Sequence, residues 1–128
     1  MGQVAKQDGV LQVLIVEDEF LVGAMMADVL AEHGFHVHVS FSAKAALEHL
    51  MCGAPCDVLF TDINLPGGMD GAALAQLARQ LRPGLPVVYA SGTVSAIEQF
   101  DAVPGAIFVA KPYSPEAVCE LLLSRARH

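Results

Sequence analysis

Five short apolar runs recur along the chain, and they constrain its fold more than any other feature of the sequence. Each run is rich in β-branched or aromatic residues, and several are apolar throughout instead of alternating with polar residues. Continuous apolar strands are typical of a parallel sheet that is buried on both faces. The runs are Val13–Val16, Phe35–Val39, Val58–Thr61, Val87–Ala90 and Ile107–Ala110.

Segments with helical character follow each of these runs. Gly34 ends the first of them, and Asp70 and Ser114 are suitable N-cap residues for the third and the last. The predicted helices are Phe20–His33, Ala43–Met51, Asp70–Arg79, a short weak one near Ser95–Asp101, and Ser114–Arg125. Strand and helix therefore alternate five times.

This alternation predicts an α/β fold with one open parallel sheet. Right-handed crossovers place helices on both faces, which gives a three-layer sandwich. Five strands suit the flavodoxin-like (βα)5 order 2-1-3-4-5, in which ligands bind outside the carboxyl ends of the strands, between the first and the third. Residues 1–10 are expected to be a flexible N-terminal segment, and residues 11–128 a single domain.

Composition excludes several classes of protein. The formal net charge is -7, so binding to a nucleic-acid backbone is not expected. The sequence has neither an apolar stretch of membrane-spanning length nor a secretory signal, so we expect a cytoplasmic protein without a membrane anchor. The three cysteines are then expected to be thiols. The start at Met1 and a helix reaching the end favour a full-length chain, although an excised piece of a larger protein stays open.

Polar residues follow the predicted strands at the points where these end. Glu17 and Asp18 follow the first strand, Asp62 follows the third, Ser91 the fourth and Lys111 the fifth. The carboxyl ends of parallel strands share one edge, so these side chains should converge there. Clustered carboxylates repel one another unless a cation joins them, and hard oxygen ligands suit Mg2+. One carboxylate could then attack phosphorus to form an acyl phosphate, with the ammonium and the hydroxyl binding phosphoryl oxygens.

Four motifs in this order resemble the receiver domain of two-component response regulators: VLIVEDE, LFTDINLPGGMDG, VVYASGT and FVAKPYS. The resemblance covers residues from about Gln12 to Arg125 and points to a stand-alone, single-domain regulator. It implies a signalling phosphoacceptor and not an enzyme with turnover. Asp62 would accept a phosphoryl group from a phosphohistidine on a histidine kinase or histidine phosphotransfer protein, in a Mg2+-dependent reaction that switches partner binding or relays the phosphate.

The same resemblance implies roles for the other site residues. Glu17, Asp18 and Asp62 would hold Mg2+ (or Mn2+), with the backbone carbonyl of Asn64 as a further ligand. Lys111 matches the lysine of the family pattern, and its bond to Pro112 is a candidate cis peptide. Ser91 and Phe108 would be the switch pair, whose side chains move on phosphorylation. Asn64 and Thr93 would tune the lifetime of the acyl phosphate.

Two surfaces are candidates for contact with other proteins. The segment FLVGAMMADVLA carries one charged residue, which is more apolar than a helix with a solvated face requires. Leu21, Val22 and Met25 are therefore candidates for docking of the phosphodonor protein, because receivers bind phosphotransfer helices on this helix. The face of the last two helices could form a homodimer. The sequence names neither the kinase nor the downstream partner.

Other interpretations stay open at this stage. The receiver fold could serve as an adaptor that works without phosphorylation, and a Mg2+-dependent phosphatase with an aspartate nucleophile is a less favoured alternative, since Asn64 stands where such enzymes commonly carry a second acid. Flavin binding is disfavoured because the loop after the first strand is acidic. His36 and His38 are interpreted as the polar face of an edge strand and not as a metal site.

Overall fold

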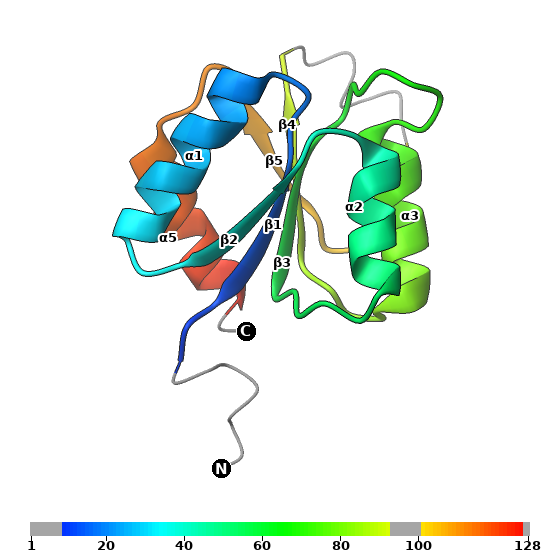
Figure 1. The fold of residues 1–128 in the computed structure, drawn as a ribbon, viewed down its shortest axis with the longest axis horizontal. Coiled ribbons are helices and arrows are strands. Elements are labelled where there is room, and N and C mark those ends of the chain that lie inside the picture. Colours follow the sequence, from blue (N-terminus) through cyan, green and yellow to red (C-terminus); the bar gives the residue numbers. More distant parts are fainter. Residues whose placement is uncertain (1–8, 93–100, 127–128) are drawn as a thin grey trace.

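The structure, a computed structural model, describes residues 9–92 and 101–126 and shows the predicted sheet (Figure 1). All four strand pairings are parallel, and the order is β2-β1-β3-β4-β5, which confirms the predicted topology. The strands are β1 (Gln12–Val16), β2 (His36–Ser40), β3 (Val58–Asp62), β4 (Val87–Ser91) and β5 (Ile107–Ala110). Only Gly9 and Val10 of the predicted flexible segment lie within the described residues.

Helices cover both faces of the sheet and complete the three-layer sandwich (Figure 1). The helices α1 and α5 lie together on one face, and α2 and α3 lie together on the other. Their bounds are α1 (Phe20–Glu32), α2 (Ala43–Met51), α3 (Gly71–Leu81) and α5 (Pro115–Ala126). The weak helix predicted near Ser95–Asp101, apart from Asp101 itself, lies outside the described residues, as does Thr93.

The central strands are mostly apolar, and they are buried because helices cover both faces of the sheet. Every residue of β1, β3 and β4 is buried. One core layer, under α2 and α3, contains Leu14, Leu59 and Leu74. The other, under α1 and α5, contains Met26 and Leu122. Among the described helices, none is long and apolar enough to cross a membrane.

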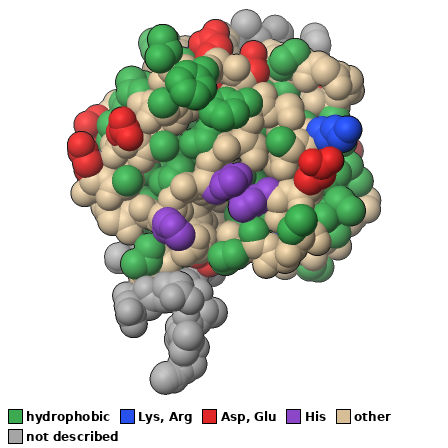
Figure 2. All heavy atoms as spheres, viewed as in Figure 1, with side chains coloured by type: hydrophobic (Ala, Val, Ile, Leu, Met, Phe, Trp, Pro, Cys, Tyr) green, Lys and Arg blue, Asp and Glu red, His purple; other side chains and the backbone are tan. Residues whose placement is uncertain are grey.

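The edge strand β2 alternates between exposed and partly buried residues. His36 and His38 point outward, which confirms that they form the polar face of this strand. Histidine side chains accordingly gather on the face of the molecule over β2 and α2 (Figure 2). The ring of His38 stacks on that of His49 in α2, with centroids 3.8 Å apart and planes 8° from parallel.

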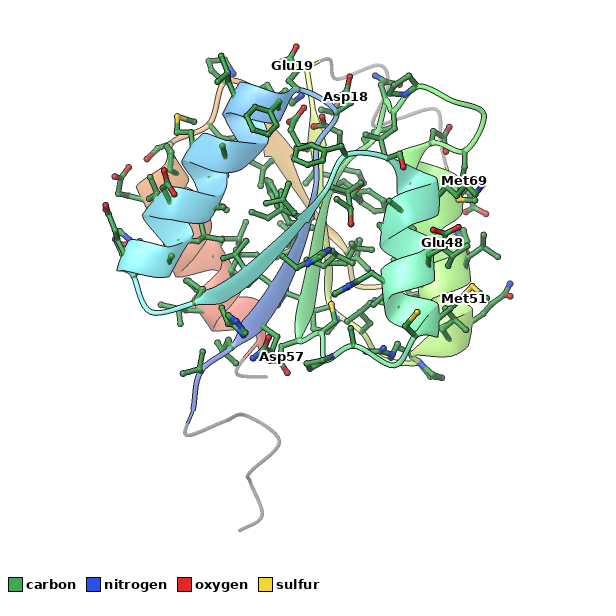
Figure 3. The ribbon with its side chains drawn as sticks, in the orientation of Figure 1. Asp18, Glu19, Glu48, Met51, Asp57 and Met69 are labelled. Atoms are coloured by element: carbon green, nitrogen blue, oxygen red, sulfur yellow. The ribbon has the colours of Figure 1, made fainter. Side chains whose placement is uncertain are left out.

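Side chains tie the loops together at the amino ends of the strands, the edge marked by Asp57 in Figure 3. The Asp57 carboxylate accepts a hydrogen bond from the Gln12 N–H at 2.7 Å, and the Gln12 side chain lies 2.8 Å from His36 Nδ1. Arg82 Nη2 donates to the carbonyls of Leu50 and Ala54, at 2.9 and 2.6 Å. Asp18 and Glu19 mark the opposite edge, where the strands have their carboxyl ends.

Polar caps set the starts of three helices. Asp70 Oδ1 accepts a hydrogen bond from Ala73 N at 2.9 Å, and Ser114 Oγ accepts one from Ala117 N at 3.2 Å, as the sequence predicts. Ser42 caps α2 in the same way. The Asp70 cap fixes the start of α3, which follows β3 after the loop of residues 63–70.

Candidate functional site

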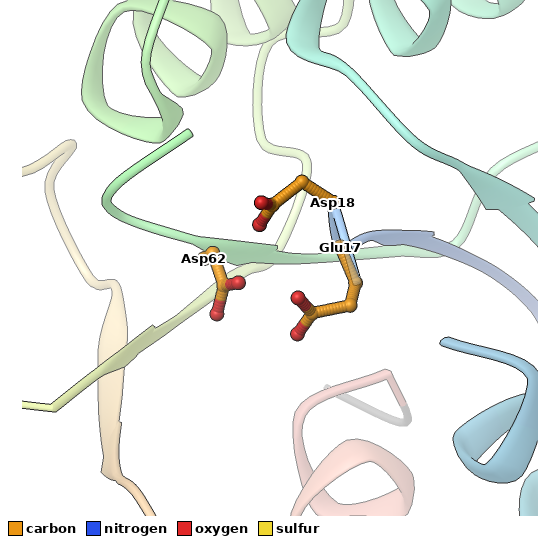
Figure 4. Close-up of side chains that lie close together, drawn as sticks. All are labelled: Glu17, Asp18 and Asp62. Atoms are coloured by element: carbon orange, nitrogen blue, oxygen red, sulfur yellow. The ribbon is translucent and has the colours of Figure 1, made fainter. Parts of the chain in front are cut away.

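Three carboxylates meet at the carboxyl edge of the sheet (Figure 4). Glu17 and Asp18 follow β1, while Asp62 is the last residue of the adjacent strand β3. One carboxylate oxygen of each lies within 4.8 Å of the corresponding oxygens of the other two. Glu17 and Asp62 are buried, and Asp18 is exposed. The adjacency of β1 and β3 thus brings together acids that lie far apart in the sequence.

Lys111, the residue after the edge strand β5, reaches this acidic group. Its Nζ lies 2.8 Å from Asp62 Oδ1 and 3.9 Å from Glu17 Oε1. The backbone N–H of Lys111 donates to the carbonyl of Ser91 at 2.9 Å, which holds the start of this loop against β4. The Lys111–Pro112 peptide is cis, as predicted. The ammonium group therefore stands directly against the carboxylate that the sequence singles out.

The electrostatics of the site are dominated by its buried acids. Burial raises the pKa of Glu17 to about 7, and the charge of Asp62 adds to the shift, although the Glu19 N–H bonded to Glu17 Oε2 partly opposes it. Burial alone would lower the pKa of Lys111, but its hydrogen bond to Asp62 and the surrounding acids raise it. Burial and then the charges of Glu17 and Asp62 also raise the pKa of Tyr113. The site therefore favours added positive charge.

The donor set fits a small divalent cation. It consists of carboxylate oxygens from Glu17, Asp18 and Asp62, which are the hard ligands that Mg2+ prefers. Two of these acids are buried, where their mutual repulsion is poorly screened, and the ammonium group of Lys111 faces them. Asp18 is exposed, so a cation could bind there while keeping several of its waters.

Gly71 is a residue of this region that the sequence analysis missed. It is the first residue of α3, and its N–H donates to the carbonyl of Ile63 at 2.8 Å. A Cβ atom at this position would overlap the backbone carbonyl oxygen of Asp62, which also accepts a hydrogen bond from Thr61 Oγ1. Only glycine lets the helix approach the end of β3 this closely. The Asp70–Gly71 pair was a sequence signal for the start of a helix. That Gly71 packs against the carbonyl of Asp62 is seen only in the structure.

The other predicted residues lie around the same edge. Ser91 is buried at the end of β4, where the neighbouring Ala90 pairs with Asp62. Asn64 is exposed in the loop after Asp62. Phe108 is half-buried in β5. All three are within the elements that form the site, whereas Thr93 is not described.

The predicted docking residues lie on α1 beside the site. Leu21 is 78% exposed and Met25 is 47% exposed, while Val22 is half-buried. Phe20 is also exposed, and its ring packs against that of Phe41 with centroids 5.5 Å apart. Hydrophobic side chains accordingly gather on the surface at this end of the molecule (Figure 2).

A pocket of about 360 Å³ connects this helix to the site. Its walls are formed by α1 and by the loop after β5, and its lining residues are Glu19, Val22, Met25, Lys111, Pro112 and Tyr113. Lys111 is thus shared between the pocket and the acidic site, so a molecule in the pocket would lie next to the Lys111–Asp62 pair.

Comparison with known proteins identifies the family. The response regulator receiver domain matches residues 13–123, and the chain belongs to this family. The fold is similar to that of a response regulator receiver protein from Sinorhizobium medicae, with a TM-score of 0.85 and 28% identity over 92% of this chain and 95% of the other. The receiver domain of the hybrid histidine kinase CckA is also similar, with a TM-score of 0.77 and 28% identity over 90% of this chain and 98% of that one.

Two curated relatives are longer proteins. The transcriptional regulatory protein CreB of Escherichia coli is 31% identical over 109 residues, which is 84% of this chain and 47% of CreB. The nitrogen assimilation regulatory protein NtrX of Azorhizobium caulinodans is 30% identical over 112 residues, which is 81% of this chain and 23% of NtrX. This chain therefore spans about half of one relative and about a quarter of the other. Receiver domains are signalling phosphoacceptors that interact with histidine kinases or phosphotransfer proteins and bind Mg2+ at an acidic pocket.

Proposed function

We propose that this receiver accepts a phosphoryl group from a phosphohistidine onto Asp62 and that the modification changes its binding to a partner protein. The observation that carries the proposal is the contact of 2.8 Å between Lys111 Nζ and Asp62 Oδ1, within an otherwise acidic and largely buried site. An ammonium group held there neutralises the carboxylate before transfer and is in reach of a phosphoryl group bound to it afterwards.

In the proposed transfer one Asp62 carboxylate oxygen attacks phosphorus. The P–O bond forms, the P–N bond to the donor imidazole breaks, and the nitrogen keeps the electron pair of the broken bond. Lys111 then pairs with a phosphoryl oxygen instead of the free carboxylate. Burial of Asp62 limits the access of water to the acyl phosphate, since the side chain is only 6% exposed.

Glu17, Asp18 and Asp62 would hold Mg2+, with the carbonyl of Asn64 as a further ligand. The ion, when bound, neutralises charge that develops on the phosphoryl oxygens. Ser91 ends the strand beside Asp62, so its hydroxyl is suited to bind a phosphoryl oxygen. Phe108 lies on the neighbouring strand and would adjust its packing when Ser91 moves. Asn64 and Thr93 would tune the lifetime of the acyl phosphate.

Acetyl phosphate with Mg2+ tests the assignment without a partner protein. Wild type should gain the mass of one phosphoryl group, and Asp62→Asn should not. Asp70→Asn is a matched control, because Asp70 is an exposed acid outside the site and Asn is an equally good helix cap. Modification that persists in Asp62→Asn while that variant remains folded would refute the assignment.

We infer that the apolar face of α1 and the adjoining pocket receive a helix of the phosphodonor protein. Continuity with the site supports this occupant, because the donor histidine must reach Asp62 and the pocket shares Lys111 with it. A residue one helical turn from the histidine would lie roughly 6 Å away along the donor helix. Its side chain could then enter the pocket against Val22 and Met25, while more exposed residues such as Leu21 cover the neighbouring turn.

Introducing a negative charge on this apolar face tests the docking site. Leu21→Glu or Met25→Glu should slow transfer from a phosphorylated histidine protein at least tenfold and leave phosphorylation by acetyl phosphate unchanged. Leu81→Glu is the control, since Leu81 is 45% exposed at the far end of α3. Equal transfer rates in all three variants would place the docking site elsewhere.

A further inference from the structure

A buried tyrosine stands next to the proposed switch residues. Tyr89 is completely buried in β4, two residues before Ser91, so both side chains point to the same face of the sheet. Its register partner on β5 is Phe108. The two rings stack with centroids 5.3 Å apart and planes 23° from parallel. Tyr89 thus contacts the aromatic switch residue from inside the core.

The hydroxyl of the same tyrosine reaches a different part of the chain. It accepts a hydrogen bond from the backbone N–H of Val103 at 3.2 Å, and Val103 is itself buried. Val103 belongs to the segment 101–104, which leads toward β5. Because a phenol hydroxyl and a backbone N–H are costly to bury without partners, this bond should persist when its surroundings shift.

Two side chains of α3 hold the same segment. Gln76 Nε2 donates to the carbonyl of Asp101 at 2.8 Å, and Arg79 Nη2 donates to the carbonyl of Pro104 at 2.9 Å. Both of these contacts are to exposed carbonyl groups, whereas the contact from Tyr89 is buried. Tyr89 therefore holds the segment 101–104 from the interior, and it does so from β4, the strand that ends at Ser91.

We propose that Tyr89 is a positioning residue of the switch, which ties the segment 101–104 to β4 and carries a displacement at Ser91 to that segment. The proposal rests on the proposed function for the source of the displacement. Packed cores transmit small shifts because their side chains cannot be compressed. A shift at the end of β4 therefore moves the Tyr89 ring, and its hydroxyl takes the Val103 backbone with it. The Tyr89 ring packs on Phe108, and its hydroxyl, which Phe108 lacks, makes the bond to the Val103 backbone.

Tyr89→Phe removes this hydroxyl and keeps the ring. Amide hydrogen exchange, followed by NMR, should accelerate at Val103 on the order of tenfold relative to the amides of β1 and β3, because one buried hydrogen bond is lost. Tyr113→Phe is the matched control, since Tyr113 packs against Phe60 in the other core layer. Unchanged exchange at Val103 in Tyr89→Phe would overturn the anchoring role.

Transmission is tested by adding beryllofluoride with Mg2+ as a stable mimic of the phosphoryl group. In wild type the amide resonances of Ser91 and of Asp101 and Val103 should shift together. In Tyr89→Phe the shift at Ser91 should persist, while the shifts at Asp101 and Val103 fall to less than half. A merely structural role would lower the melting temperature and leave the ratio of these shifts unchanged, and that result would overturn the proposal.

A second variant guards against poor folding of the first. Phe108→Leu leaves the Tyr89–Val103 hydrogen bond in place, so the response at Val103 should be retained. Its loss in this variant would assign transmission to Phe108 and overturn the role of Tyr89. If wild type shows no beryllofluoride response at Ser91 or Lys111, the proposed function is refuted. Transmission from Ser91 through Tyr89 to the segment 101–104 is then refuted as well. The exchange experiment would still decide the anchoring role.

Discussion

Replacing Gly71 with alanine should damage both the stability of the domain and its phosphoacceptor site. The new Cβ would overlap the carbonyl oxygen of Asp62 and approach its carbonyl carbon at 2.8 Å and Ile63 Cα at 3.0 Å. All three are backbone atoms, so relief requires α3 to retreat from β3. Overpacking of this kind costs about 1–3 kcal/mol, and loss of the Gly71–Ile63 hydrogen bond about 1 kcal/mol more.

The expected destabilisation is therefore about 2–4 kcal/mol, against a total stability of roughly 5–15 kcal/mol for such a domain. At about 4 °C per kcal/mol for this chain length, the melting temperature should fall by about 8–16 °C. Thermal unfolding followed by circular dichroism measures the change. The higher helix propensity of alanine applies to helix interiors and is not counted here, because Gly71 is the first residue of α3.

Gly92→Ala is the matched control for this experiment. Gly92 follows Ser91 at the same edge of the sheet, and a Cβ there would meet none of the described residues within 4 Å. Its effect should stay within about 0.5 kcal/mol. The retreat of α3 should also displace Asp62, so phosphorylation of the folded Gly71→Ala protein by acetyl phosphate should slow. A melting temperature equal to that of Gly92→Ala would refute the close-approach argument.

Three further predictions follow from the site and from a helix cap. Lys111→Met should slow phosphorylation by acetyl phosphate at least tenfold and tighten Mg2+ binding, measured by titration, because the variant loses the ammonium group that contacts Asp62 and a positive charge beside the acids that would hold the ion. Burial and the charge of Asp62 raise the pKa of Glu17 from 4.5 to about 7, so the folded metal-free protein keeps a proton that the unfolded chain has lost. Stability in EDTA should therefore fall as the pH rises through this window, Mg2+ should bind more tightly above it, and both trends should weaken in Glu17→Gln. Asp70→Ala should cost about 1 kcal/mol in urea unfolding through loss of the cap on Ala73 N, and Asp70→Asn should cost almost nothing.

Much of the fold was predictable because it is set by local patterns. Continuous apolar runs such as Val58–Thr61 have no polar face, so they had to be central strands of a parallel sheet. The alternating residues of β2 likewise marked an edge. Strand order then followed from the number of strand–helix repeats. The convergence of Asp18, Asp62 and Lys111 was predictable for the same reason, since each lies at the carboxyl end of its strand or in the loop that follows.

Contacts between segments that are distant in the sequence were not predictable in this way. Nothing in the sequence around Gly71 states that its neighbour is the carbonyl of Asp62. The hydrogen bond between Tyr89 and Val103 joins a strand to a loop, and its partner depends on how that loop crosses the sheet. The stacking of His38 on His49 depends on the height at which α2 packs on β2. Periodicity fixes which face a side chain occupies but not which atom it meets.

The two rims of the sheet are built on different chemistry. At the amino ends, Arg82 and Asp57 bind backbone groups of β1, α2 and the loop after α2, so substitutions there remove contacts that keep the chain folded. At the carboxyl ends, Lys111 pairs with Asp62 and Glu17, and the proposed function adds an ion and a phosphoryl group that bind there reversibly. Substitutions of the acidic side chains at the carboxyl rim should therefore change binding more than folding, whereas substitutions of Arg82 or Asp57 at the opposite rim should destabilise the fold.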